Sequence, residues 1–140
     1  MSDLSAFFAQ NVNSDVTEEV IVSERFKDSE GKPVPWKIRS MTEEENEAIR
    51  KSATRRVKGP NGTQTQEVNP NEYAAKLVVT SVVFPNLKDS DLQKSYGVMG
   101  AEALLRKMLF PGEYSTLLQK VQELNGFDKN MEELMDEVKN

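Results

Sequence analysis

Four helix-breaking sites between residues 84 and 128 constrain the fold of this chain more than any other feature of its sequence. Each site combines an aromatic or aliphatic residue with a glycine or a proline, and the sites occupy residues 84–87, 96–102, 109–114 and 124–128. Such combinations end one helix and set the direction of the next. Short helices divided in this way cannot bury their apolar faces alone and must pack on one another. Residues 72–140 are therefore predicted to form a mostly helical half built from short helices.

The N-terminal half carries the alternating pattern of β-strands. Residues 19–26 are rich in β-branched side chains, and Val34, Trp36 and Ile38 alternate with polar or proline neighbours. Between these runs, residues 28–33 form a loop in which a glycine can take a positive φ. We predict an antiparallel hairpin over residues 17–41, with room for a third short strand. Because a two-stranded hairpin is not stable alone, helices must pack against it, and the expected fold class is α+β.

The remaining segments complete an expected single domain of residues 1–140. Residues 42–57 are predicted to form a helix, because Thr42 and Glu45 have capping-box spacing and basic residues follow at the other end. Residues 58–71 contain two turn signals and are expected to be a mobile loop. Residues 1–16 form an arm with apolar residues at helical spacing, namely Leu4, Phe7 and Phe8. This arm either folds back on the core or binds a partner.

The chain lacks both histidine and cysteine, which excludes many kinds of chemistry. Without histidine there is no catalytic triad and no common proton shuttle, and without cysteine there is no disulfide and no thiolate ligand. The other residue types form no catalytic, cofactor or metal-binding motif, so we predict that the protein is not an enzyme and binds no cofactor. No apolar run in the sequence is long enough to span a bilayer, so no membrane association is expected.

The charge of the chain argues against nucleic acid as a partner. The formal net charge is -5, and an acidic protein binds nucleic acid poorly unless its charges are segregated. Arg50, Lys51, Arg55 and Arg56 do form a basic cluster. We interpret this cluster as the complement of a helix dipole on a solvated face, because the same helix opens with three glutamates. A nucleic-acid regulator would need these residues on one exposed face without acidic neighbours.

The last segment of the chain is the strongest candidate for an interaction surface. Its apolar residues follow i, i+3, i+4 and i+7 spacing on a helix that is otherwise charged: Met131, Leu134, Met135 and Val138. One interpretation is that this stripe docks on the core of its own molecule. The other is that it grips a helix of a partner, helped by the adaptable methionine side chains.

Several short blocks of the sequence resemble the XkdN-like phage tail assembly chaperones, a family of contractile-tailed phages and prophages of Gram-positive bacteria. The blocks in the N-terminal half are residues 25–28, 31–34, 36–39, 45–47 and 50–52. Those in the C-terminal half are residues 96–102, 109–114 and 125–128. None of them is a catalytic motif, so the resemblance rests on their number and order. It extends from about Leu4 to Lys139, and residues 58–71 contribute least.

The resemblance implies a non-catalytic role in building a phage tail. Such chaperones bind the long, helical tape measure protein and keep it soluble for assembly of the tail tube. The implied location is the cytoplasm of the bacterial host, and the implied partners are the tape measure protein, the tail tube protein and a second copy of the chain. The protein is then expected to be absent from the mature virion. The main alternative is a structural tail or connector subunit, and a nucleic-acid regulator is the weaker one.

A chaperone for helical segments needs an apolar groove between helices and an acidic, soluble exterior. We therefore predict that the C-terminal helices form such a groove. Its candidate contact residues are Leu117, Leu118, Val121, Met131, Leu134, Met135 and Val138.

Overall fold

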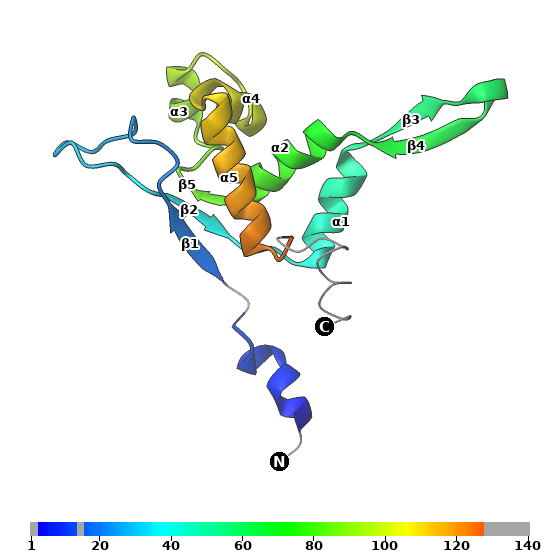
Figure 1. Ribbon diagram of the computed structural model, residues 1–140, viewed down its shortest axis with the longest axis horizontal. Helices are drawn as coiled ribbons and strands as arrows, with labels where there is room; N and C mark the ends of the chain where they lie inside the picture. The colour runs from blue at the N-terminus through cyan, green and yellow to red at the C-terminus, as the bar shows by residue number, and fades with distance from the viewer. Residues whose placement is uncertain (1–2, 14–15, 128–140) are drawn as a thin grey trace, which may run out of the picture.

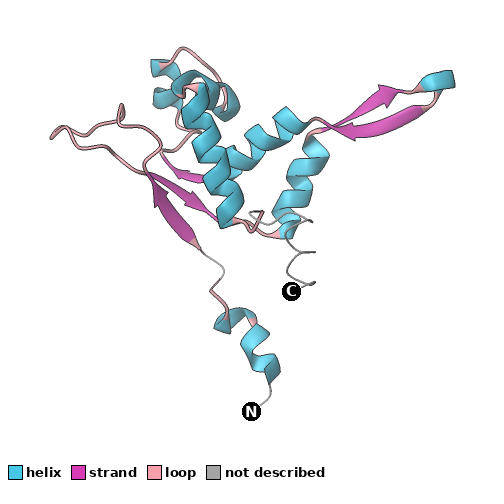
Figure 2. Ribbon diagram, viewed as in Figure 1, coloured by secondary structure: helices cyan, strands magenta, loops and turns pink. Residues whose placement is uncertain are grey.

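A computed structural model of the chain describes residues 3–13 and 16–127. Strands and helices are mixed, as Figures 1 and 2 show. The strands are β1 (Thr17–Val20), β2 (Trp36–Arg39), β3 (Thr54–Lys58), β4 (Gln64–Val68) and β5 (Val82–Phe84). The α-helices are α1 (Glu43–Ser52), α2 (Pro70–Ser81), α3 (Ser90–Ser95), α4 (Ala101–Met108) and α5 (Pro111–Leu124). Short 3₁₀ turns lie at Asp3–Phe7, Ala9–Asn11 and Pro60–Gly62. The predicted α+β class is confirmed.

The main sheet has the strand order β1-β2-β5, and all of its pairs are antiparallel. Strand β1 pairs with β2 from Thr17 opposite Arg39 to Val20 opposite Trp36. The expected hairpin therefore forms, but its first strand ends at Val20 and not near Phe26. Residues 21–35 connect the two strands as a long loop, which contains a β-bridge between Lys27 and Pro33 and a backbone hydrogen bond from Val34 to Phe26 at 2.7 Å. The third strand that the sequence allowed is β5, which follows α2 directly.

One core joins the sheet to the helical half. Trp36 and Ile38 project from the sheet and are fully or almost fully buried. They pack with the apolar faces of α2, α4 and α5, including Leu77, Val78, Leu104, Leu105, Leu117 and Val121. Phe26 from the long loop covers Trp36, and the centroids of their rings are 5.9 Å apart. The short helices thus bury their apolar faces on one another and on the sheet, as the breaks between them require.

The structure corrects two predicted boundaries between residues 42 and 71. Helix α1 begins after Thr42, whose hydroxyl and the Glu45 carboxylate form the expected capping box, but it ends at Ser52 rather than at residue 57. Residues 58–71 are not one loop, because β3 and β4 form a second antiparallel sheet within residues 54–68. Figure 1 shows this hairpin extending away from the helices. Both strands mix β-branched residues with charged or amide residues, a composition that favours a strand exposed on both faces.

The ends of the later helices agree with the predicted breaks. The Asp89 carboxylate accepts a hydrogen bond from the backbone N–H of Leu92 at 2.8 Å and so caps α3. Pro111 occupies the first turn of α5, and Gly126 follows its end with a φ of 82°. Helix α2 is shorter than predicted, because Val82 already belongs to β5. The apolar stripe predicted from Met131 to Val138 lies outside the described residues.

Candidate partner-binding groove

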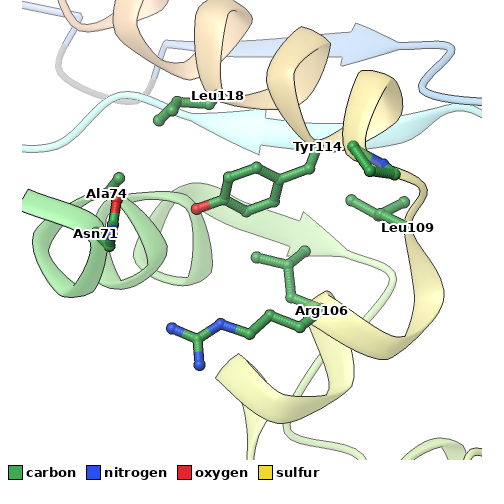
Figure 3. Close-up of a pocket in the computed structure, with 8 residues that line it drawn as sticks. Asn71, Ala74, Arg106, Leu109, Tyr114 and Leu118 are labelled. Atoms are coloured by element: carbon green, nitrogen blue, oxygen red, sulfur yellow. The ribbon is translucent and has the colours of Figure 1, made fainter.

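A groove of about 620 Å³ lies where α2, α4 and α5 meet. Its lining is mostly apolar and comes from all three helices and the turn between α4 and α5: Asn71, Ala74, Leu105, Arg106, Leu109, Pro111, Tyr114 and Leu118. Figure 3 shows the ring of Tyr114 reaching from α5 toward Asn71 and Ala74 on α2. The small side chain of Ala74 leaves room in front of this ring. The groove can therefore accept apolar side chains from outside, with an aromatic ring as one wall.

The open side of the groove is polar. Asn71 and Arg106 are exposed, and Arg106 forms no ion pair with any of the residues that the structure describes. Burial raises the pKa of the Tyr114 hydroxyl above its usual value, which the nearby Arg106 opposes and Glu102 reinforces. The phenol therefore stays neutral and can donate or accept a hydrogen bond. This edge suits a partner that brings a carboxylate or an amide beside its apolar side chains.

A brace built on Arg25 holds the turn between α4 and α5 that forms one end of the groove. The Arg25 guanidinium donates to the Met108 carbonyl at 2.9 Å and to the Glu113 carboxylate at 3.1 Å, and it lies 3.9 Å above the Phe110 ring centroid. The Glu113 carboxylate also accepts from the backbone N–H of Phe110 at 2.8 Å. The hydrogen bond from Arg25 lowers the pKa of Glu113 to about 2. The long loop is thereby tied to the start of α5.

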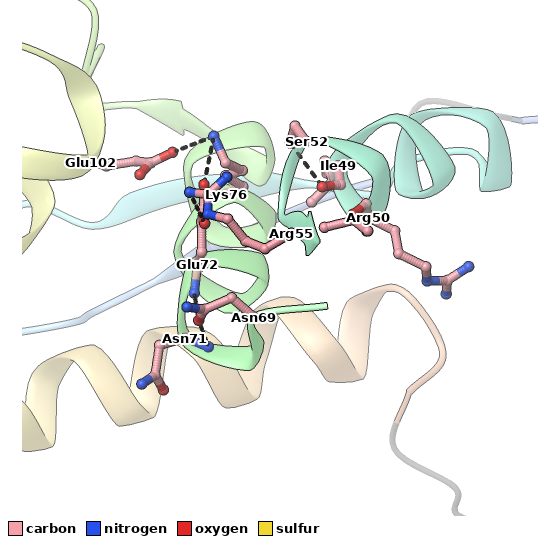
Figure 4. A network of polar contacts seen from close by, with 10 residues as sticks. Ile49, Arg50, Ser52, Arg55, Asn69, Asn71, Glu72, Lys76 and Glu102 are labelled. Carbon is pink, nitrogen blue, oxygen red and sulfur yellow. Dashed lines mark hydrogen bonds and ion pairs between the residues drawn. The ribbon is translucent and has the colours of Figure 1, made fainter. Parts of the chain in front are cut away.

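A second polar network joins the base of the hairpin to the other wall of the groove. The Asn69 side chain accepts hydrogen bonds from the backbone N–H groups of Asn71 and Glu72, both at 3.0 Å, and caps α2. Glu72 then binds Arg55 of β3 at 2.6 Å, and Lys76 binds Glu102 of α4 at 3.1 Å. Figure 4 shows these contacts running along α2. Helices α2 and α4 are thus linked beside the groove, and the base of the hairpin is anchored to α2 by Arg55.

The residues predicted to contact a partner fall into three groups. Leu118 is half-buried and lines the groove, as expected of a contact residue. Leu117 and Val121 have no exposed surface, so a partner would reach them only if α5 moved. Met131, Leu134, Met135 and Val138 lie outside the described residues. Partner binding by these residues stays a prediction, and of the three predicted on α5 Leu118 is the one whose surface a partner can reach.

Sequence reasoning did not identify Ala74, Arg106 and Tyr114 as neighbours in one groove. Tyr114 follows the same helical spacing as Leu117, Leu118 and Val121, so periodicity placed it on the inner side of α5. Its position beside α2 and α4 depends on how three helices cross, which periodicity does not encode. The brace was also hidden, because Arg25 and Glu113 lie 88 residues apart and no spacing in the sequence pairs them.

The basic cluster does not form a face free of acidic residues. Arg50 binds Glu47 one turn away on α1, and Arg55 binds Glu72 on α2. Lys51, Arg56 and Lys58 are exposed and have no ion pair within the described part of the chain. The condition set for a nucleic-acid regulator is therefore not met by this arrangement.

Among residues 3–13 and 16–127, no three acidic side chains are gathered closely enough to hold a metal ion. None of the helices in those same ranges combines the length and the apolar character needed to cross a membrane.

Comparison with known proteins gives consistent matches along the chain. Residues 4–139 match the family of phage XkdN-like tail assembly chaperone proteins. YqbN of Bacillus subtilis (strain 168) is 32% identical over 141 residues, which cover 99% of this chain and 93% of YqbN. XkdN of the phage-like element PBSX in the same strain is 28% identical over 141 residues, covering 99% of this chain and 94% of XkdN. A crystal structure of YqbN superposes with a TM-score of 0.77 and 27% identity, covering 91% of this chain and 99% of that one.

Proposed function

The chain belongs to the family of phage XkdN-like tail assembly chaperones, and from that premise we propose that it binds the tape measure protein of its phage or prophage through the groove between α2, α4 and α5. A tape measure protein is long and helical, and a helix presents apolar side chains along one side. Such a face fits an apolar groove between helices. Holding it there would keep the tape measure protein soluble until the tail tube assembles around it.

The observation that carries this proposal is the composition of the groove. Leu109, Tyr114 and Leu118 supply apolar surface, while Asn71 and Arg106 supply polar groups along the open side. Interfaces of this kind combine a buried apolar centre with a polar rim. Arg106 can pair with an acidic residue that flanks the apolar stripe of a bound helix, which would favour one direction of binding.

A role of this kind requires no bond to be made or broken. The sequence contains no histidine and no cysteine, and the groove is lined by no acidic residue that could act as a general acid or base. Its function would consist only of binding a partner at its surface. The protein would act in the host cytoplasm, where tape measure protein is made, and would leave before the virion matures.

The test is co-expression with the tape measure protein of the same phage or prophage. Wild-type chain should keep the tape measure protein in the soluble fraction and be recovered with it in a pull-down. Leu118→Glu places a charge in the groove without removing a core residue, since Leu118 is only half-buried. We expect this variant to bind roughly tenfold more weakly or worse, because burying an unpaired carboxylate is costly.

The matched control is Ser115→Glu, which adds the same charge to an exposed position of α5 that does not line the groove. This variant should bind tape measure protein as the wild type does, and both variants should keep the circular dichroism spectrum of the parent. If Leu118→Glu and the wild type bound the tape measure protein equally well, the contact surface would have to lie outside the groove. Finding the chain in purified mature particles would favour a structural tail or connector subunit instead.

A further inference from the structure

The β3–β4 hairpin lacks a core of its own. Every residue from Arg55 to Lys58 and from Gln64 to Val68 is exposed, and Figure 1 shows the hairpin extending away from the helices. Two strands without a buried face are marginally stable in water. Both of the outer edges also leave backbone N–H and C=O groups without a strand partner among the described residues. Such an edge is a template for pairing with another strand.

The charges on β3 set it apart from the rest of an acidic molecule. It carries Arg55, Arg56 and Lys58, whereas the chain as a whole has a net charge of -5. Because directly opposed residues share a face, Arg56 and Lys58 lie with Gln66 and Gln64 on one side of the hairpin. No acidic side chain shares that side within β3 and β4, whereas Arg55 on the other side lies opposite Glu67.

Strand β1 presents the opposite charge on an open edge. It is the outer strand of the main sheet, and its two central residues, Glu18 and Glu19, are both exposed. Glutamates on an edge strand discourage pairing between two copies of the same strand, because like charges would face each other. They do not discourage a basic strand. Of the remaining edges, β5 carries no charge and β4 carries a single glutamate, so β3 is the basic edge among the described strands.

We propose that β3 of one copy of this chain pairs antiparallel with the outer edge of β1 of a second copy. In the antiparallel register that turns the free backbone N–H and C=O groups of both edges toward each other, Glu19 lies opposite Arg56, Thr17 opposite Lys58, Glu18 opposite Val57 and Val20 opposite Arg55. Glu19 then meets Arg56 directly and Lys58 diagonally, and Glu18 lies diagonally from Arg55. The pairing joins the two-stranded sheet of one copy to the three-stranded sheet of the next.

The positions of the two strands make this contact intermolecular. Figure 1 shows the hairpin and β1 toward opposite ends of the molecule's long axis. The contact is therefore heterologous, and repeating it would build a head-to-tail ring or open chain rather than a symmetric dimer. It leaves the groove between α2, α4 and α5 uncovered, so it is independent of the proposed binding of tape measure protein. Because charge pairs contribute to it, added salt should weaken it.

The experiment is sedimentation velocity of the full chain over a wide range of concentrations, at low and high salt. Wild-type protein should show a mass that rises with concentration, and less so at high salt. Glu19→Arg should lose this self-association, and so should the double variant Arg56→Glu/Lys58→Glu, each by roughly tenfold or more in apparent affinity. An equimolar mixture of the two variants should regain concentration-dependent association, because β1 of each variant is complementary in charge to β3 of the other.

Matched controls keep the test specific. Lys94→Glu/Lys107→Glu changes the net charge as much as the hairpin variant does, and Glu24→Arg changes it as much as the β1 variant does. All three positions changed in these controls are exposed and lie outside β1 and β3. Both controls should associate as the wild type does. A wild-type chain that stays monomeric at every concentration, or a mixture that fails to associate, would overturn the proposal, whether or not the chain binds tape measure protein.

Discussion

At the scale of single residues, one arginine connects parts of the chain that are far apart in sequence. Arg25 lies 83 residues before the carbonyl and 88 residues before the carboxylate that its guanidinium binds. The same group stacks on the rings of Phe26 and Phe110. A planar guanidinium can satisfy a carboxylate, a carbonyl and an aromatic face together, which a lysine cannot do with the same geometry. Arg25 therefore fixes the long loop against the end of the groove.

This contact predicts how stability depends on pH. The folded pKa of Glu113 is lowered from 4.5 to about 2 by its hydrogen bond with Arg25, so the carboxylate stabilises the fold at any pH above the unfolded value. That contribution is lost as the pH falls from about 4.5 toward about 2. Arg25→Met should lower the free energy of unfolding at neutral pH, and its disadvantage relative to the wild type should shrink across this acid range.

The measurement is urea denaturation of both proteins at several pH values, followed through the fluorescence of Trp36, which is buried and the only tryptophan. Lys27→Met is the matched control, because it removes a neighbouring exposed cation that makes no ion pair within the described residues. A difference between Arg25→Met and the wild type that stays constant from neutral to acid pH would contradict the role given to Glu113.

At the scale of elements, the sequence predicts the ends of the later helices but not the β3–β4 hairpin. The helices end where the sequence places a cap, a proline or a glycine, and their buried faces follow from their apolar spacing. The β3–β4 hairpin was missed, because its strands bury nothing and so carry no alternation of apolar and polar residues. The turn at Asn61 and Gly62, both with positive φ, was recognised only as a break. An asparagine–glycine pair between β-branched residues is also a hairpin signal.

Shortening the hairpin should abolish self-association and leave the stability of the fold almost unchanged. Replacing residues 56–66 by an Asn-Gly turn joins Arg55 to Glu67, which already face each other. Because the replaced residues make no core contact within the described part of the chain, the melting temperature should change by less than about 3 °C. The same variant should lose self-association, because Arg56 and Lys58 are gone. A fall of tens of degrees, measured by circular dichroism, would show instead that the hairpin supports the core.

At the scale of the whole molecule, the sheet and the helices share one apolar core. Trp36 and Ile38 of the sheet belong to the same buried cluster as Leu77 of α2, Leu105 of α4 and Leu117 of α5. Elements that are buried against each other become exposed to water together, so small domains of this kind unfold in one step. This shared cluster supports the expectation that the chain forms a single domain, which stays a prediction.

Unfolding should therefore be a single cooperative transition when it is followed by two independent probes. Trp36 fluorescence reports on the sheet, and far-ultraviolet circular dichroism reports mainly on α2, α4 and α5. The two curves should have the same midpoint in urea. The hairpin variant with residues 56–66 replaced is a useful control, since its two unfolding curves should also have the same midpoint. Two separated midpoints would mean that the sheet and the helical half unfold as different units.

What could be read from the sequence was mainly local. The α+β class, the helix ends at Asp89, Pro111 and Gly126, and the strand around Trp36 and Ile38 all depend on residues close in the chain. The family resemblance also needed only the order of short blocks. Even the missed hairpin was local, and its turn residues were visible.

The groove and the brace depend on contacts between residues that lie far apart in the sequence. Leu117, Leu118 and Val121 have the same apolar character and similar spacing, yet two are in the core and only Leu118 faces the groove. Helical periodicity identifies a buried side but not which neighbour covers it, because that is decided by how α2, α4 and α5 cross. The sequence by itself therefore determined the elements and the absence of imidazole and thiol chemistry, and only tertiary packing decided which apolar side chains remain open to a partner.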